Sequence, residues 1–257
     1  MKKDTLIGAG AILVVLVGII AYALLRPLPA KAPGTADASN LPAGSYTEHA
    51  AYYDIAANYA TSTQLLTSVG ASADAAAIAQ MKNFVGSTIA QFKTDGKFDS
   101  LTAQDIKMMG FDQGRKETLN IVYLIASSPR TVSYIFTVYT DTLGAHGNTS
   151  FHTFTFDTTT GASLALSDVF TPSSPYSSTL SSLARTMLPG IIGDGADTGM
   201  IDSGTTPGNK NFENFFFDNK DFVVLFAPYQ VAAYTAGPQT LRIPVSQLSS
   251  ILKPDYR

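Results

Sequence analysis

The residues of this sequence best suited to chemistry are its three histidines, His49, His146 and His152. His146 and His152 flank a predicted turn and can approach each other across it, and Asp157 follows on the same segment. A zinc site would need three or four converging ligands. Alternation along a strand puts His152 and Asp157 on opposite faces, so one strand cannot present both. We therefore predict no metal site and interpret the histidines as turn and sheet residues.

Two tyrosines, Tyr229 and Tyr234, are the next candidates, because they flank a predicted strand end beside Pro228. Exposed aromatic side chains often form the contact surface for a protein or a glycan. In the alternative interpretation the string only maintains the fold: Pro228 and Gly237 set the bends, and the tyrosines cover the sheet edge. The predicted binding residues are Tyr229, Tyr234, His146 and His152.

Other reactive groupings in the sequence are incomplete. Asp194, Asp197 and Asp202 miss the spacing of a calcium loop, and no bidentate Glu follows them. There is no nucleophile elbow, no Ser-x-x-Lys and no glycine-rich phosphate loop. Beyond Arg26 the chain carries 14 basic and 19 acidic residues without a basic cluster, which argues against nucleic acid as a partner. We therefore predict a non-enzymatic protein with no catalytic residues and no cofactor.

Residues 6–25 form an uncharged segment in which twelve of twenty residues are Leu, Ile or Val. A helix of this length spans about 30 Å, and its insertion into a bilayer is favoured by about 5 kcal/mol. Lys2 and Lys3 precede it, so we predict a single-pass membrane protein with residues 1–5 in the cytosol and the remainder outside the cell. Cleavage of the segment as a secretory signal is the alternative and would export the same domain.

The exported part divides into a Pro- and Ala-rich linker, residues 26–45, and a domain, residues 46–257, with sub-halves 46–143 and 144–257. In the first sub-half we expect a strand over 46–59 and an amphipathic helix over 72–94 capped by Ser72. Thr102 and Asp105 predict a capping box that begins a short helix.

The second part of the domain shows mainly the two-residue period of strands. A meander is expected over 118–127, 131–142 and 149–157, followed by a helix over 176–188 and a loop over 189–210. Further strands are expected over 212–217, 222–226, 231–234 and 241–243, and a terminal helix is expected to begin at Pro244. These elements predict an α+β fold: an antiparallel sheet with packed helices, preceded by one N-terminal transmembrane helix.

Two strings of this domain resemble a known family of bacterial extracytoplasmic domains. The first runs from Gly144-Ala145-His146-Gly147-Asn148-Thr149 to Leu166-Ser167-Asp168-Val169-Phe170, and the second from Phe226-Ala227-Pro228-Tyr229-Gln230 to Tyr234-Thr235-Ala236-Gly237. Over about residues 46–253 the chain resembles the domain of unknown function of the lysozyme-sensing anti-sigma factor RsiV. A related domain precedes the catalytic part of the peptidoglycan deacetylase PdaC.

The resemblance implies an exposed binding module without the effector that usually accompanies it. RsiV-type receptors carry a cytosolic sigma-binding segment, whereas we expect only residues 1–5 in the cytosol here. PdaC-type enzymes add a deacetylase domain, which we do not expect before Arg257.

We therefore predict a membrane-anchored, non-enzymatic binding module for a cell-envelope protein or a peptidoglycan component, with a lysozyme-like protein as one candidate. The alternatives are a cell-wall hydrolase or deacetylase that uses His146, His152 and Asp157, and a purely structural envelope protein.

Overall fold

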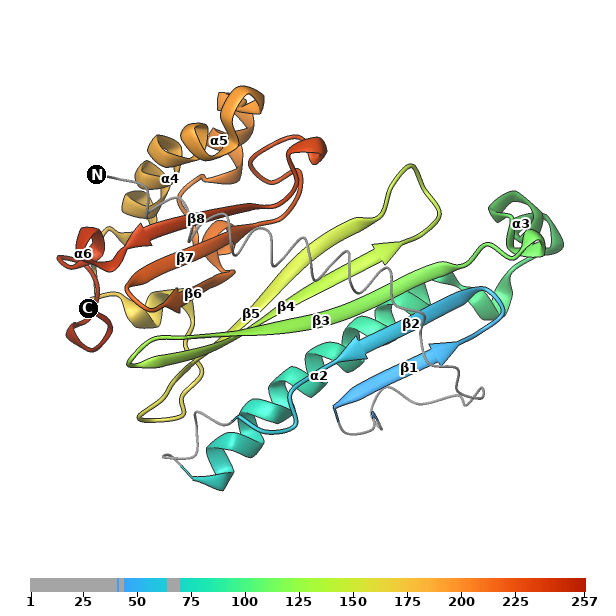
Figure 1. The fold of residues 1–257 in the computed structure, drawn as a ribbon, viewed down its shortest axis with the longest axis horizontal. Helices are drawn as coiled ribbons and strands as arrows, with labels where there is room; N and C mark the ends of the chain where they lie inside the picture. The colour runs from blue at the N-terminus through green and yellow to red at the C-terminus, as the bar shows by residue number, and fades with distance from the viewer. Residues whose placement is uncertain (1–40, 42–43, 64–69) are drawn as a thin grey trace, which may run out of the picture.

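A five-stranded sheet forms one half of the described molecule (Figure 1). The computed structural model describes residues 41, 44–63 and 70–257. The strands lie side by side in sequence order: β1 (Ser45–His49), β2 (Tyr53–Asn58), β3 (Glu117–Ser127), β4 (Thr131–Asp141) and β5 (Asn148–Asp157). The expected single strand over 46–59 is wrong, because the chain turns back after His49 and pairs β1 with β2 as a hairpin. The expected meander is confirmed as β3–β4–β5.

The first sheet is mixed, which corrects the prediction of a purely antiparallel sheet. β2 runs parallel to β3, whereas the other neighbouring strands are antiparallel. A parallel pair needs a crossover connection, and here the connection contains the helices α2 (Ala71–Gly96) and α3 (Ala103–Met109). The α+β class is confirmed.

Helix α2 covers one face of the first sheet (Figure 1). Its predicted apolar stripe is buried at Met81, Val85, Ile89 and Phe92. The predicted cap at Ser72 is wrong, because the helix begins after Gly70 and no side chain caps it. The capping box of Thr102 and Asp105 on α3 is confirmed, with both reciprocal bonds present.

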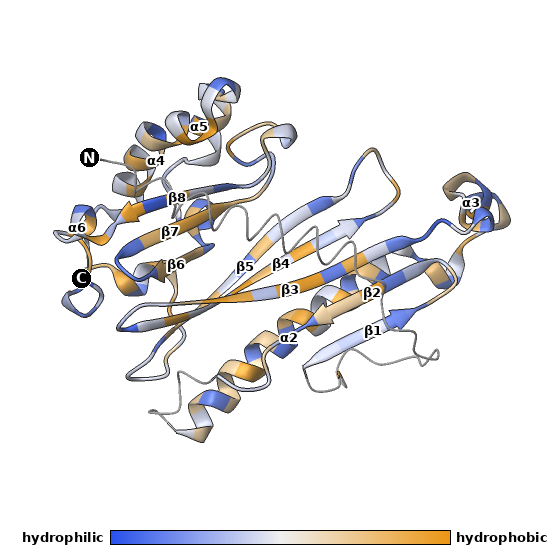
Figure 2. Ribbon diagram, in the orientation of Figure 1, coloured by the Kyte–Doolittle hydropathy of each residue, from blue (hydrophilic) through white to orange (hydrophobic). Residues whose placement is uncertain are grey.

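The second sheet lies against the other face of the first sheet. It consists of β6 (Phe215–Asp218), β7 (Asp221–Phe226) and β8 (Gln239–Pro244), all antiparallel. Phe216, Val223 and Leu225 pack against Ile135 and Phe151 of the first sheet. Figure 2 shows the apolar colouring of β6 and β7, which lie near the C-terminal end of β3. The layers are therefore helix, sheet, sheet and helix.

Helix α4 (Tyr176–Ile192) covers the outer face of the second sheet. Because β7 is buried on both faces, its apolar run is continuous rather than alternating. Helix α4 passes through Pro189, which corrects the predicted end at 188, because Leu188 and Ile192 still pack into the core below. The predicted loop over 189–210 instead contains α5 (Thr198–Gly204), capped by the carboxylate of Asp197.

The last part of the chain differs from the prediction in two places. No strand forms over 231–234, because Pro228 cannot donate a backbone bond and Tyr229 turns the chain with a φ of 69°. Pro244 ends β8 instead of opening the first helical turn, and α6 (Val245–Leu248) follows it.

The short 3-10 helices are η3 (Phe98–Ser100), η4 (Phe111–Gln113), η5 (Leu166–Val169), η6 (Gly193–Gly195), η7 (Asn209–Phe212), η8 (Tyr234–Ala236) and η9 (Pro254–Tyr256).

The predicted cytosolic tail (1–5), the membrane segment (6–25) and nearly all of the linker (26–45) lie outside the described residues. Within the described ranges, no helix is long and apolar enough to cross a bilayer. The anchor therefore stays a prediction.

Candidate functional site

Three of the four predicted binding residues converge in the structure. The rings of His146 and Tyr234 stack with their centroids 3.7 Å apart and an interplanar angle of 19°. The ring of Tyr229 lies 5.5 Å from that of Tyr234, and its hydroxyl is 3.1 Å from His146 Nε2. We call these three residues the aromatic cluster. It joins the loop between β4 and β5 to the segment after β7, although His146 and Tyr229 are 83 residues apart in sequence.

The backbone of Gly147 holds the loop side of the aromatic cluster in place. Its carbonyl oxygen accepts a hydrogen bond from the Tyr234 hydroxyl at 2.9 Å and lies 2.9 Å from His146 Nδ1. A Cβ atom on Gly147 would lie 2.2 Å from the Tyr139 hydroxyl, so a larger residue here would require the Tyr139 ring to move. The two contacts of the Gly147 carbonyl connect His146 and Tyr234 to the same backbone group.

Tyr229 projects from a strained turn. It is 54% exposed and has a φ of 69°, a region that is sterically unfavourable for a bulky residue. Strained conformations of this kind persist where the surroundings enforce them, and they concentrate at functional sites. The aromatic cluster thus combines an exposed ring, a supporting stack and a constrained backbone.

Gln230 is a positioning residue that sequence reasoning missed. Its amide nitrogen donates to the carbonyls of Asn211 at 3.1 Å and Gly204 at 3.3 Å, and its amide oxygen accepts from Ala227 N at 3.3 Å. These bonds clamp the turn that carries Tyr229. The signal available in the sequence was its place directly after Tyr229 in the Phe-Ala-Pro-Tyr-Gln string.

Gly204→Ala is expected to weaken this clamp. A Cβ on Gly204 would lie 1.9 Å from the carbonyl oxygen of Gln230, and overpacking of this kind costs about 1–3 kcal/mol in the free energy of unfolding. The matched control is Gly190→Ala in α4, where a Cβ meets nothing within 4 Å and the helix gains up to about 1 kcal/mol. Urea denaturation of both variants measures the difference. Equal stability of the two variants would contradict the close packing of Gly204 on Gln230.

His152, the fourth predicted binding residue, lies apart from the aromatic cluster. Its ring stacks on Phe84 of α2 at 4.4 Å and lies 4.6 Å from that of Phe154. Desolvation in these surroundings lowers the pKa of His152. The residue therefore belongs to the face of the first sheet that α2 covers.

The alternative catalytic group of His146, His152 and Asp157 is not assembled. Asp157 is 2% exposed and accepts hydrogen bonds from Arg130 Nε at 2.9 Å and from the Tyr256 hydroxyl at 3.0 Å. Each of the three residues therefore has a different set of neighbours. In the described part of the chain, no three His, Asp or Glu side chains are grouped as metal ligands.

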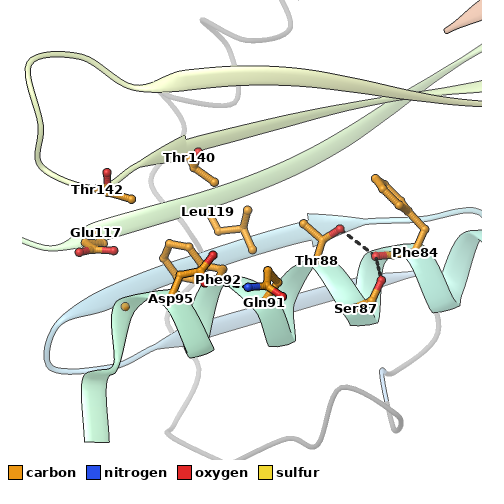
Figure 3. Close-up of a pocket in the computed structure, with 11 residues that line it drawn as sticks. Phe84, Ser87, Thr88, Gln91, Phe92, Asp95, Glu117, Leu119, Thr140 and Thr142 are labelled. Atoms are coloured by element: carbon orange, nitrogen blue, oxygen red, sulfur yellow. Dashed lines mark hydrogen bonds between the residues drawn. The ribbon is translucent and has the colours of Figure 1, made fainter. Parts of the chain in front are cut away.

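A cavity of about 540 Å³ lies between α2 and the strands β3 and β4 (Figure 3). We call it the α2 cavity. Phe84, Phe92 and Leu119 supply its apolar wall, whereas Glu117, Gln91 and Asp95 are among its polar lining residues. Sequence analysis missed it, although the alternation of Glu117 with Leu119 and Ile121 in one strand indicated a carboxylate on the buried face.

The surroundings of Glu117 in the α2 cavity disfavour its ionised form. The residue as a whole is 6% exposed. Desolvation raises the pKa of Glu117, and the nearby Asp141 carboxylate raises it further.

Part of the chain matches a known protein family. Residues 167–246 match the model of a family described as "Protein of unknown function (DUF3298)". This match covers α4, α5 and the second sheet, and it includes Tyr229 and Tyr234. Structural similarity extends to a member of the DUF3298 family from Bacteroides fragilis NCTC 9343, with a TM-score of 0.53 and 16% identity. That alignment covers 82% of this chain and 92% of the other, and it shows a shared fold only.

One enzyme shares a longer stretch of sequence. The chain is 34% identical over 143 residues to the peptidoglycan-N-acetylmuramic acid deacetylase PdaC of Bacillus subtilis (strain 168). The alignment covers 55% of this chain but spans only 31% of the length of that enzyme.

Proposed function

We propose that this protein is a non-enzymatic binding module of the cell envelope, anchored through residues 6–25, that contacts its ligand with the aromatic cluster. The observation that carries the proposal is the convergence of His146, Tyr229 and Tyr234 on an exposed, constrained turn. Tyrosine supplies a large and rigid contact area with a polar tip, which suits both protein and glycan surfaces.

The similarity to PdaC supports a peptidoglycan component as the ligand class, since the name of that enzyme places its substrate in peptidoglycan. A lysozyme-like protein is the other candidate within the same proposal. The carboxylates Asp194, Asp197 and Asp202 do not supply a rival site, because Asp197 caps α5 and Asp202 pairs with Arg185 at 3.1 Å.

The experiment is a binding measurement on the purified full-length chain in detergent. We expect it to cosediment with insoluble peptidoglycan or to bind lysozyme saturably in calorimetry. The variant Ile125→Ser is the control for substitutions of Tyr229. Ile125 and Tyr229 are both 54% exposed, but Ile125 lies on a different part of the surface, so Ile125→Ser should bind like the parent chain. Absence of saturable binding to both probes would contradict the proposal.

A further inference from the structure

The α2 cavity is lined by Glu117, a residue that is 6% exposed and whose carboxylate has no hydrogen-bond partner among the described residues. Glu117 begins β3, and the two-residue alternation of that strand directs it to the same side as Leu119, toward α2. Its backbone is bonded in the sheet, and its nitrogen donates to Tyr52 O at 2.9 Å. No hydrogen bond or ion pair reaches its carboxylate from the residues that the structure describes. A partly desolvated carboxylate without a protein donor is stabilised when a ligand supplies one.

Three other polar residues that line the α2 cavity can also accept hydrogen bonds. Ser87 Oγ and Thr88 Oγ1 donate their protons to Phe84 O, at 2.9 and 2.8 Å, as the dashed lines in Figure 3 show. Their lone pairs therefore remain for an incoming donor. Gln91 Nε2 donates to Asp95 Oδ1 at 2.7 Å, which leaves the Gln91 carbonyl oxygen as a further acceptor.

The charge of the cavity points to a cation. Glu117 and Asp95 are both acidic, and no lysine or arginine is among the described lining residues. An anionic ligand would meet two carboxylates without a compensating charge. An ammonium group brings three N–H donors and a positive charge, which complement the two carboxylates and the acceptor atoms of Ser87, Thr88 and Gln91.

The apolar wall defines the rest of the ligand. Phe92 and Leu119 are buried core residues beside Glu117, and the ring of Phe84 lines the same cavity. Such a wall suits methylene groups, which gain about 0.8 kcal/mol each on burial. We propose that the α2 cavity binds a primary ammonium group carried on a short aliphatic chain. This site is separate from the aromatic cluster and does not depend on the function proposed above.

The test is an NMR titration of the purified full-length chain with 1-aminopentane and, in parallel, with the neutral isostere 1-pentanol. We expect saturable shifts at the backbone amides of Thr88, Gln91 and Leu119 with the amine and much weaker ones with the alcohol. Equal responses to the two compounds would overturn the proposal, because the charge would then contribute nothing.

Glu117→Gln keeps the shape of the side chain and removes its charge. We expect at least about tenfold weaker binding of 1-aminopentane, since a charge-assisted bond is lost. The control Glu213→Gln makes the same change at an exposed residue and should bind like the parent chain. Thr88→Val, which removes one acceptor at nearly constant volume, should weaken binding less than Glu117→Gln. Unchanged affinity in Glu117→Gln would overturn the proposal.

Thermal denaturation supplies an independent readout for the same variant. Glu117→Gln should raise the melting temperature at pH 7, because the penalty for burying an unpaired charge disappears. A lower melting temperature would mean that the carboxylate has a structural partner, which would contradict the premise of the proposal.

Discussion

Asp157→Ala is expected to lower the free energy of unfolding by about 3 kcal/mol, because it removes a buried carboxylate that accepts four hydrogen bonds, one of them from the partly exposed Arg130. Asp157 accepts hydrogen bonds from Arg130, from the Tyr256 hydroxyl and from the backbone N–H groups of Thr159 and Thr160. These partners come from the β3–β4 turn, the turn after β5 and the C-terminal segment, so one carboxylate ties together three parts of the chain. Urea denaturation at pH 7 measures the loss. The control Asp112→Ala removes an exposed carboxylate and should change stability by no more than about 0.5 kcal/mol.

The loss caused by Asp157→Ala should shrink in acid. Burial alone would raise the pKa of Asp157, but the bonds from Arg130, the two backbone N–H groups and Tyr256 outweigh burial and lower it. A lowered folded-state pKa means that the stabilisation is complete above the unfolded value, about 3.9, and is lost as the pH falls through the folded value. The difference between parent and variant should therefore be largest near pH 7 and decrease below about pH 4. A constant difference from pH 7 to pH 3 would contradict the role of the ionised carboxylate.

Tyr229→Gly is expected to weaken ligand binding by about 30-fold or more while leaving the fold intact. The loss corresponds to about 2 kcal/mol, which is typical of a central tyrosine in an interface. The free energy of unfolding should change by less than about 1 kcal/mol, because two effects oppose each other. Glycine relieves the strain of the left-handed backbone, about 1–2 kcal/mol. Glycine also loses about 0.5–1 kcal/mol more conformational entropy on folding. The measurements are calorimetric titration with the ligand found in the binding test and urea denaturation.

Asn219→Gly is the control for Tyr229→Gly. Asn219 has a φ of 56° in the turn between β6 and β7, so this variant also introduces glycine at a left-handed position, away from the aromatic cluster. Its ligand affinity should equal that of the parent chain. If Tyr229→Gly binds the ligand with the affinity of the parent chain, the aromatic cluster is not the contact surface. This conclusion does not depend on the stability of the variant.

The elements with strong local patterns were predictable from the sequence. The helix over 72–94 and the strands over 118–127 and 131–142 all form, with ends that differ by a few residues. The prominence of Tyr229 and Tyr234 was also predictable, because the string that contains them combines aromatic residues with Pro228. Their role as a ligand surface stays a prediction.

The candidate site itself was only partly predictable. Periodicity reports which face of a segment is apolar, but not which distant segment covers that face. His152 was therefore predicted to approach His146, because the two residues are close in sequence. In the structure the ring of His152 stacks on Phe84 of α2 instead. For the same reason the aromatic cluster could not be assembled in advance, since its two halves are separated by more than eighty residues.

By itself, the sequence determined the α+β class, the amphipathic helix α2 and the hairpin β3–β4, because each depends on the order of polar and apolar residues along a short stretch. The tertiary structure alone decided the parallel pairing of β2 with β3, the stacking of two sheets and the enclosure of Glu117 beside α2. These features depend on which apolar faces bury each other across long connections. That choice is governed by the free energy of the whole core rather than by any local pattern.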